Sequence, residues 1–229
     1  ESFIRRAIES WSANPNIEIL GNTKAERLSI ISFVVRHEGS YLHHNFVVAL
    51  LNDLFGIQSR GGCSCAGPYG HRLLGIDVEL SHQYEREIRL GCEGIKPGWV
   101  RVNFNYFISE AVFEYVLEAV HLVATEGWRL LPDYRFDIDT GIWRHRLAPP
   151  EPPLRLSDVG YDEFGRLSYT ASHTRAPESA LAGYLGDARR LLASRPDVER
   201  GETGPLGVDL VTADFEALRW FELPAACLE

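Results

Sequence analysis

The chain has 229 residues, of which 45 % are hydrophobic and 11 % aromatic, so it can form a packed core in one large domain or a medium domain with an appendage. A formal net charge of −9 argues against nucleic acid or an anionic membrane as partner. The sequence shows no signal peptide and no apolar run near the roughly 20 residues of a membrane-spanning helix. The four cysteines do not have the spacing of a secreted disulfide framework. We therefore expect a cytoplasmic protein.

The two ends of the sequence are unusual. The chain contains no methionine, and two explanations stay open: methionines left out of the sequence, or a start inside a longer protein. The final Leu228-Glu229 resembles the residue pair left by cloning before a C-terminal tag, so the fold prediction leaves it out.

The first part of the chain is predicted to alternate between helix and strand. Residues 2–13 have apolar residues at helical spacing and stop before a proline, which disfavours helix in the residue that precedes it. The β-branched run within 27–36 predicts a buried strand. A helix over 42–55 and a short strand over 57–60 follow.

The middle of the chain continues this mixed pattern. Ser81 is predicted to cap a helix that runs to Leu90. Apolar and polar residues alternate over 99–105, which indicates a strand, and residues 109–127 carry one continuous apolar stripe, which indicates a helix. Residues 134–144 predict a hairpin with Asp-Thr-Gly at its turn.

A proline-rich stretch divides the sequence into two predicted parts. Residues 1–148 are expected to form an α+β domain with a small three- to four-stranded sheet, covered on one face by helices. Four prolines within 149–153 predict a stiff linker. The acidic C-terminal extension, 149–229, carries one predicted helix over 178–193, and its role stays open. The uncovered face of the sheet is expected to be apolar and to favour self-association.

Residues 60–68, Arg-Gly-Gly-Cys-Ser-Cys-Ala-Gly-Pro, are the strongest candidate for a site. They place two thiols, Cys63 and Cys65, beside the cation of Arg60 on a glycine-rich turn. A cysteine beside a cation ionises more readily than a free one, and the thiolate is the nucleophile. Glycine lets the backbone approach a ligand closely. The alternative is that both thiols are small buried hydrophobes.

Two patterns imitate metal sites without completing them. A zinc site would recruit His71 or Cys92, but Cys-x-Cys with a distant histidine fits no standard zinc spacing. Asp137, Asp139 and Gly141 imitate the start of a calcium loop, but the glutamate expected later is missing. A hairpin turn explains the second pattern better, and no metal is predicted.

Arg101 is the most informative single charge. It lies in the middle of a predicted strand between the apolar Val100 and Val102, so its guanidinium is expected to emerge at a cleft and bind an anion. Arginine is suited to a bidentate hold on a carboxylate. His43-His44, at the start of a predicted helix, are interpreted as solvated or as lying near the helix cap.

These features follow one another in the order of a known family. The sequence has, in turn, a strand, a helix, Gly56-Ile57, Arg60, Gly62, Cys65-Ala66, Pro68, a strand with Arg101, and a helix that starts at Ser109. This order resembles the C-terminal small domain of class V, fold-type I enzymes that depend on pyridoxal phosphate (PLP). Cysteine desulfurases and selenocysteine lyases are the most similar in motif. The resemblance covers about residues 29–124, somewhat under half of the chain.

The resemblance implies roles for individual residues. Cys65 falls on the position of the persulfide-forming cysteine, with Cys63 as a second candidate, and Arg101 falls on the arginine that binds the substrate α-carboxylate. Arg60 and His71 are further candidates for substrate binding. The implied cofactor is PLP, the implied substrate is an amino acid, and a homodimer is expected.

The chain also departs from the family. Ser64 stands where desulfurases often carry histidine, so an aminotransferase or another lyase fits as well as a desulfurase. Lys24 and Lys96 are the only lysines, and neither context resembles that of the family's Schiff-base lysine. The large PLP domain is therefore expected to be missing, and this chain alone should neither hold PLP covalently nor turn over substrate.

Two other classes of function remain open. The chain could be an interaction or dimerisation module that keeps the fold, with inert thiols at Cys63 and Cys65. It could also be a thiol redox protein in which these two cysteines form a reversible disulfide.

Overall fold

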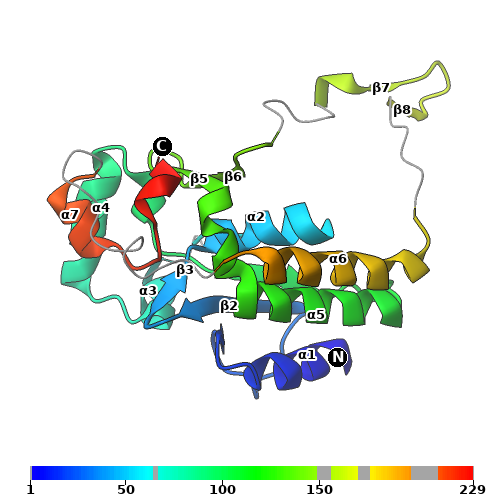
Figure 1. Ribbon diagram of the computed structural model, residues 1–229, viewed down its shortest axis with the longest axis horizontal. Helices are drawn as coiled ribbons and strands as arrows, with labels where there is room; N and C mark the ends of the chain where they lie inside the picture. Colours follow the sequence, from blue (N-terminus) through cyan, green and yellow to red (C-terminus); the bar gives the residue numbers. More distant parts are fainter. Residues whose placement is uncertain (1, 64–66, 149–155, 170–175, 197–210, 229) are drawn as a thin grey trace.

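A computed structural model describes residues 2–63, 67–148, 156–169, 176–196 and 211–228 (Figure 1). The predicted nucleophile Cys65 and the proline-rich linker lie outside these ranges. The helices are α1 (Ser2–Ser12), α2 (His44–Phe55), α3 (Gly67–Leu74), α4 (Val78–Arg89), α5 (Glu110–Glu126), α6 (Leu181–Ser194) and α7 (Ala213–Leu218). The strands are β1 (Ile17–Ile19), β2 (Ile30–His37), β3 (Ser40–Leu42), β4 (Val100–Asn103), β5 (Tyr134–Asp137), β6 (Ile142–His145), β7 (Val159–Tyr161) and β8 (Leu167–Tyr169).

Short 3-10 helices complete the described secondary structure. They are η1 (Glu93–Ile95), η2 (Gly127–Asp133), η3 (Leu156–Asp158), η4 (Glu178–Ala180) and η6 (Ala225–Leu228). Strands β7 and β8 form a separate two-stranded hairpin that stands apart from the helices in Figure 1.

Strand β2 is the centre of the main sheet. Its Val35 pairs with Ile17 of β1 and Leu42 of β3, and its Phe33 pairs with Ile19 of β1 and Val100 of β4. Strand β1 therefore lies along one edge of β2, while β3 and β4 share the other edge. All these pairings are antiparallel, so the predicted α+β class with a small sheet is confirmed.

One face of this sheet builds the main core. Ile31, Phe33 and Val35 alternate along β2 and are fully or almost fully buried, because successive side chains of a strand point to opposite faces. Helices α1, α2 and α5 pack over this side, and the ring of Trp11 in α1 lies 5.3 Å from that of Phe33. The helices predicted over 2–13, 42–55 and 109–127 are all present.

The opposite face of the sheet differs from the expected apolar surface. Val34, Leu20 and Trp99 are buried there in a small second cluster against α3, while Ser32 and Arg101 are partly exposed. Polar residues alternate with Val34 along β2, so this face is mixed in character. Several large apolar side chains are exposed at the end where β2 begins and β4 ends, namely Leu28, Ile30, Tyr106 and Phe107.

Two local predictions hold and two need correction. Ser109 caps α5, since its hydroxyl accepts from the Val112 N–H at 3.2 Å, and Asp137 closes the β5–β6 turn as expected. Helix α4 begins at Val78 with Asp77 as its cap, so Ser81 lies inside the helix. Residues 57–60 form no continuous strand, and only Arg60 makes a β-bridge.

The C-terminal residues are part of the same core. Helix α6 packs on α5 and α2, and α7 packs on α4. Phe221 forms a parallel bridge to Tyr41, beside β3, and the Glu222 N–H donates to the Tyr41 carbonyl at 2.8 Å. Phe215, Phe221 and Leu223 are fully buried. These residues therefore complete the core that residues 1–148 begin.

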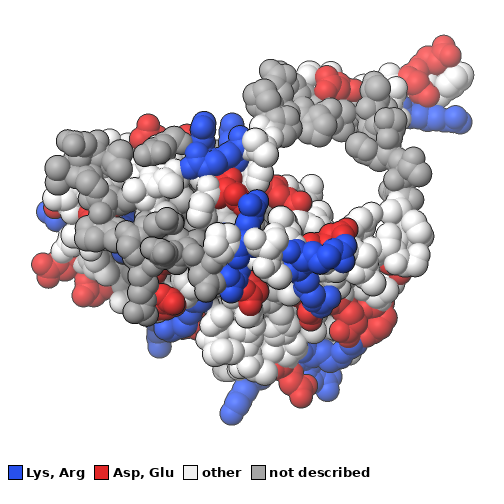
Figure 2. Space-filling view, viewed as in Figure 1, with Lys and Arg blue, Asp and Glu red and all other residues white. Residues whose placement is uncertain are grey.

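Charge is distributed over the surface in pairs. Arg36 of β2 lies 2.5 Å from Glu18 of β1, and Arg189 of α6 lies 2.5 Å from Glu118 of α5. On the face shown in Figure 2, Lys and Arg side chains lie among Asp and Glu rather than gathering in one basic area. In the described ranges, no helix combines the length and the apolar character needed to cross a bilayer.

Substitution of Phe221 tests whether the C-terminal residues stabilise the core. Phe221→Ala should lower the free energy of unfolding by about 3–5 kcal/mol, because it leaves a cavity at a fully buried ring. Phe164→Ala, at a phenylalanine that is 76 % exposed, is the control and should change it by less than about 0.5 kcal/mol. Urea denaturation measures both. Equal, small effects would contradict a shared core.

Candidate functional site

The candidate site begins where the chain from Arg60 to Gly62 runs antiparallel along the outer edge of β4. The Arg60 N–H donates to the Arg101 carbonyl at 3.1 Å, and the Arg101 N–H donates to the Arg60 carbonyl at 2.8 Å. One step further, the Trp99 N–H donates to the Gly62 carbonyl at 3.2 Å. Residues directly opposite in such a pair project from the same face. Arg60 and Arg101 are therefore neighbours on the face of the sheet that carries Trp99.

Arg101 also holds the start of the cysteine loop. Its Nη2 donates to the Cys63 carbonyl at 2.9 Å and to the Gly62 carbonyl at 3.4 Å, and its guanidinium lies over the Trp99 ring, 5.2 Å from the centroid. A guanidinium over an indole face gains cation–π energy. The predicted arginine and the predicted thiol loop, 38 residues apart in sequence, thus meet in the structure.

Glycines allow this close approach of backbone to backbone. A Cβ at Gly98 would lie 2.7 Å from the Gly62 carbonyl carbon and 2.8 Å from Cε1 of His44, and one at Gly61 would lie 2.5 Å from Oδ1 of Asn45. Gly62 itself has φ +112°, in the region that favours glycine. The loop therefore rests directly on the first turn of α2 and on the chain before β4.

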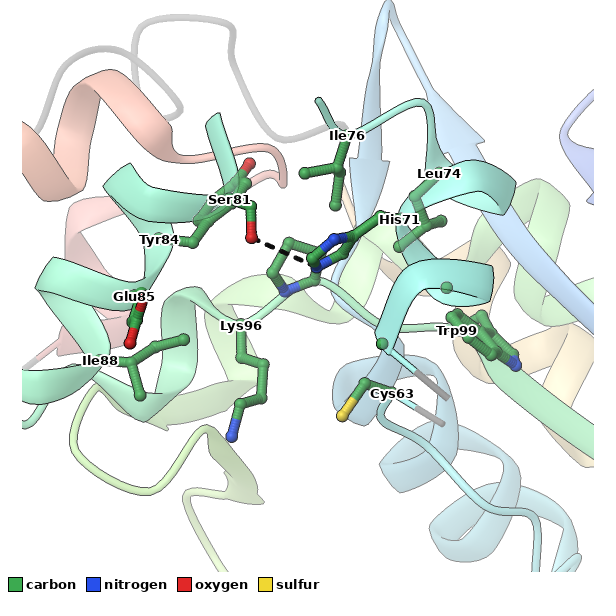
Figure 3. Close-up of a pocket in the computed structure, with 13 residues that line it drawn as sticks. Cys63, His71, Leu74, Ile76, Ser81, Tyr84, Glu85, Ile88, Lys96 and Trp99 are labelled. Carbon is green, nitrogen blue, oxygen red and sulfur yellow. Dashed lines mark hydrogen bonds between the residues drawn. The ribbon is translucent and has the colours of Figure 1, made fainter. Parts of the chain in front are cut away.

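Cys63 lies at the edge of a cavity of about 250 Å³ between α3, α4 and the chain before β4 (Figure 3). His71 and Lys96 line the same cavity, and the Cys63 thiol points toward the side of the cavity on which Lys96 lies. Nε2 of His71 lies 3.5 Å from the Ser81 hydroxyl, and the Lys96 ammonium lies 2.8 Å from Glu93. A thiol, an imidazole and an ammonium group therefore share one small cavity.

The predicted site residues are placed as follows. Cys63 and His71 line the cavity, and Arg101 donates a hydrogen bond to the Cys63 carbonyl. Arg60 is exposed beside Arg101 and does not belong to the cavity lining. Cys65 lies outside the described residues. Because Cys63 is exposed, the interpretation of this thiol as a buried hydrophobe is wrong.

Sequence reasoning missed the wall opposite Cys63. Tyr84 and Ile88 of α4, with Lys96 and Trp99 on the chain before β4, complete the cavity. The Lys-Pro-Gly-Trp run immediately before an alternating strand was the available signal, because Pro and Gly mark a turn that leads into that strand. Nothing in the sequence spacing places α4 beside the cysteine loop.

Below the loop, His43 and His44 form a buried pair. Their rings are stacked 4.2 Å apart, and the His44 ring is nearly parallel to Trp220 at 5.8 Å. Nδ1 of His43 accepts from the Asn45 N–H at 3.2 Å, which caps α2, and its Nε2 lies 3.2 Å from the Gly94 carbonyl. The expected position near the cap is confirmed for His43, whereas solvation is wrong for both rings, because they are buried. The His44 ring lies against Gly61 and Gly98, and both rings stack on Trp220.

Burial controls the charge of this pair. Desolvation, followed by the neighbouring His44 ring, lowers the pKa of His43 well below its usual range. Desolvation and then the positive charge of Arg101 lower the pKa of His44 to about 3. Nδ1 of His44 is buried without a hydrogen-bond partner among the described residues. Both imidazoles are therefore neutral in the folded protein at neutral pH.

A pH titration of stability tests this neutral pair. The pKa of His44 is near 6.5 in the unfolded chain and about 3 in the folded protein. Between these two pH values the unfolded chain therefore binds more protons than the folded protein. The free energy of unfolding should therefore fall as pH drops below about 6.5, with His44 contributing up to about 1.4 kcal/mol per pH unit. Denaturation of the wild type and His44→Phe at pH 7 and pH 5 measures the difference.

The expected result is a shallower pH dependence in His44→Phe than in the wild type. His82→Phe is the control for replacing a surface histidine, since the His82 side chain is 70 % exposed beside Glu85, and its comparison with His44→Phe isolates the effect of burial. Equal slopes for the wild type and His44→Phe would show that His44 is not held neutral by burial.

Comparison with protein-family models and with curated proteins finds no match for this sequence. Among the described residues, no three His, Cys, Asp or Glu side chains converge as the ligands of a metal ion do. The function must therefore be argued from the geometry of the Arg101–Cys63 site.

Proposed function

We propose that this chain is the C-terminal small domain of a class V PLP-dependent transferase or lyase that acts on an amino acid. The observation that carries the proposal is the bond from Arg101 Nη2 to the Cys63 carbonyl, 2.9 Å long. It joins the group suited to hold a carboxylate to the loop that carries the thiols. The resemblance implies the carboxylate-binding role for Arg101 and the nucleophile role for Cys65, with Cys63 as the second candidate.

The arginines favour an anionic ligand. Arg60 and Arg101 project from adjacent chains on the same face, so two positive charges lie near each other at the edge of the sheet. A carboxylate held by a guanidinium gains charge-assisted hydrogen bonds, which are stronger than neutral ones. Fixing the carboxylate also fixes the orientation of the reacting bonds of the substrate.

The chain's own lysines do not fit covalent attachment of PLP. Lys24 is exposed on a loop, and Lys96 forms an ion pair with Glu93. In the proposed protein, a separate large domain supplies the lysine and the phosphate site. PLP, when bound there, supplies an electron sink for bonds at the Cα atom of the amino acid. The part of the chain described here supplies the hold on the carboxylate and the loop.

A thiol on this loop would extend the chemistry to sulfur-containing substrates. The thiolate sulfur bonds to the substrate sulfur, the substrate C–S bond breaks, and its electron pair stays with the carbon fragment. Cys63 is exposed and lines the cavity, so it can meet a ligand there. We assign the nucleophile to Cys65, with Cys63 as the second candidate.

An exposed apolar area supports the packing of a second unit beside this site. Leu28 and Ile30 flank Ser29, whose carbonyl accepts from the Phe104 N–H at 2.8 Å, and Tyr106 and Phe107 follow on the same chain. Tyr106 is 96 % exposed and Phe107 is 72 % exposed. Grouped exposed aromatic residues are typical of surfaces that another unit covers. We assign this area to the large domain.

The complete gene product tests the proposal. It should be yellow from bound PLP and should convert at least one amino acid in a panel that includes cysteine. Arg101→Gln should lower kcat/KM by about 10- to 100-fold, because it removes a charge-assisted hydrogen bond to the substrate. Arg189→Gln, at a half-exposed arginine of α6 that pairs with Glu118 away from the site, is the control and should leave kcat/KM unchanged.

Other outcomes identify the competing functions. A colourless complete protein that converts no amino acid would contradict the proposal and favour a binding module. A yellow protein that releases sulfide from cysteine, and loses this activity in Cys65→Ala, would select the desulfurase branch. A yellow protein that transaminates without a thiol requirement would select the aminotransferase branch.

A further inference from the structure

A second, larger cavity lies on the other side of Leu74, Ile76 and Tyr84 from the cavity at Cys63. We propose that the two cavities together bind the large apolar side chain of the substrate, whose carboxylate lies at the Arg101 end. This inference rests on the proposed function, and it adds the class of substrate: an aromatic or long aliphatic amino acid.

The two cavities share a wall. The first has a volume of about 250 Å³ and the second about 420 Å³, and Leu74, Ile76, Tyr84 and Pro97 line both. Pockets for small molecules typically measure about 300–1,000 Å³. The second cavity by itself falls within this range, and Leu74 and Ile76 are part of the wall between it and the first.

The lining is apolar away from Cys63. Trp99, Ile88 and Tyr84 form much of the first cavity, and Figure 3 shows Leu74 and Ile76 at the side away from the thiol. The second cavity continues over further apolar and aromatic side chains, namely Leu20, Val34, Tyr41, Leu73, Leu80 and Trp220. Burying apolar surface here gains free energy in proportion to the area removed from water.

Cations lie near the Cys63 end, while Arg72 and Glu18 are the charged residues of the second lining. Lys96 lines the first cavity beside Cys63, and the Arg101 guanidinium lies over Trp99, which belongs to the same lining. A ligand with a carboxylate at this end and an apolar tail directed toward Leu74 matches that distribution. An amine at the same end would be repelled by the Arg101 guanidinium, whereas the Lys96 charge is paired with Glu93.

The acidic groups of the two linings are already paired. Glu85, at the first cavity, lies 2.6 Å from Arg89, and Glu18, at the second cavity, lies 2.5 Å from Arg36. Their charges are therefore largely compensated by arginine and do not offset the positive end. His71 and Ser81 lie 3.5 Å apart on the wall and can contact a polar atom of the side chain.

Two segments that are far apart in the sequence, α4 and the residues around Trp220, form these walls. Helix α4 supplies Leu80, Tyr84 and Ile88, and Tyr84 is fixed by a hydrogen bond from its hydroxyl to the Leu218 carbonyl at 3.2 Å. Trp220 is fixed by a hydrogen bond from its indole N–H to the Ile95 carbonyl at 3.0 Å. The C-terminal residues thus shape the proposed specificity pocket as well as the core.

Protection of Cys63 from alkylation tests the inference without turnover. In a Cys65→Ser background, iodoacetamide labelling of Cys63 is followed by mass spectrometry in the presence of acetate, butanoate, hexanoate or 3-phenylpropanoate. Apparent affinity should rise about fourfold for each added methylene that the cavity buries. Hexylamine, which has the tail without the carboxylate, should not protect.

Variants of the shared wall locate the tail. Leu74→Trp should abolish the gain from butanoate to hexanoate while leaving acetate unchanged, and Leu90→Trp, at a leucine that is 73 % exposed, is the matched control. Should Leu74→Trp fail to fold, Leu74→Ala serves instead and should shift the preference toward 3-phenylpropanoate. Affinity independent of tail length, or equal protection by hexylamine, would overturn the inference.

These results separate the inference from the proposed function. Graded protection by the acids, together with a complete gene product that binds no PLP, would leave the apolar pocket standing and overturn the proposed function. A yellow, active gene product with no dependence on tail length would overturn the pocket alone.

Discussion

The antiparallel pairing of Arg60–Gly62 with β4 is the constraint on which the candidate site depends. β4 is already paired with β2, so this second pairing fixes the chain before the cysteines to the edge of the sheet. It aligns Arg60 with Arg101 and brings the Cys63 carbonyl within 2.9 Å of the Arg101 guanidinium. Glycine is required at 98 because a Cβ would meet the Gly62 backbone, at 61 because it would meet the Asn45 side chain, and at 62 because φ is +112°. A side chain at any of these positions would displace the thiol loop from the arginine.

Segments that are distant in sequence together form the cavity beside this edge of the sheet. The α3–α4 region forms the cavity next to Cys63, and the C-terminal residues fix its walls through Tyr84 and Trp220. The neutral His43–His44 pair fills the space beneath the loop, where a charged ring would be costly beside Arg101. The core and the site are therefore coupled. A substitution that weakens the packing of the C-terminal residues also changes the contacts beneath the cysteine loop and the shape of the cavity.

Much of the fold could be predicted from the sequence, because its signals are local. The Ser109 cap, the apolar stripe of α5 and the alternation in β2 and β4 each depend on residues a few positions apart. Two residues that the sequence singles out lie at the site, since Arg101 contacts the thiol loop and His71 lines the cavity. The rest depends on contacts across long sequence distances. The pairing of Phe221 with Tyr41 joins residues 180 positions apart, and nothing in the spacing of the histidines indicates that Trp220 covers them.

The central claim is that Arg101, held against the thiol loop, binds the carboxylate of a small-molecule substrate. Calorimetric titration of 3-phenylpropanoate into the wild type and Arg101→Gln, with 3-phenylpropanamide as the uncharged control ligand, tests it most directly. The account predicts that the acid binds the wild type, that Arg101→Gln weakens this binding by at least about tenfold, and that the amide binds both proteins weakly and equally. Equal affinity of both proteins for the acid, with unchanged thermal stability, would contradict the claim.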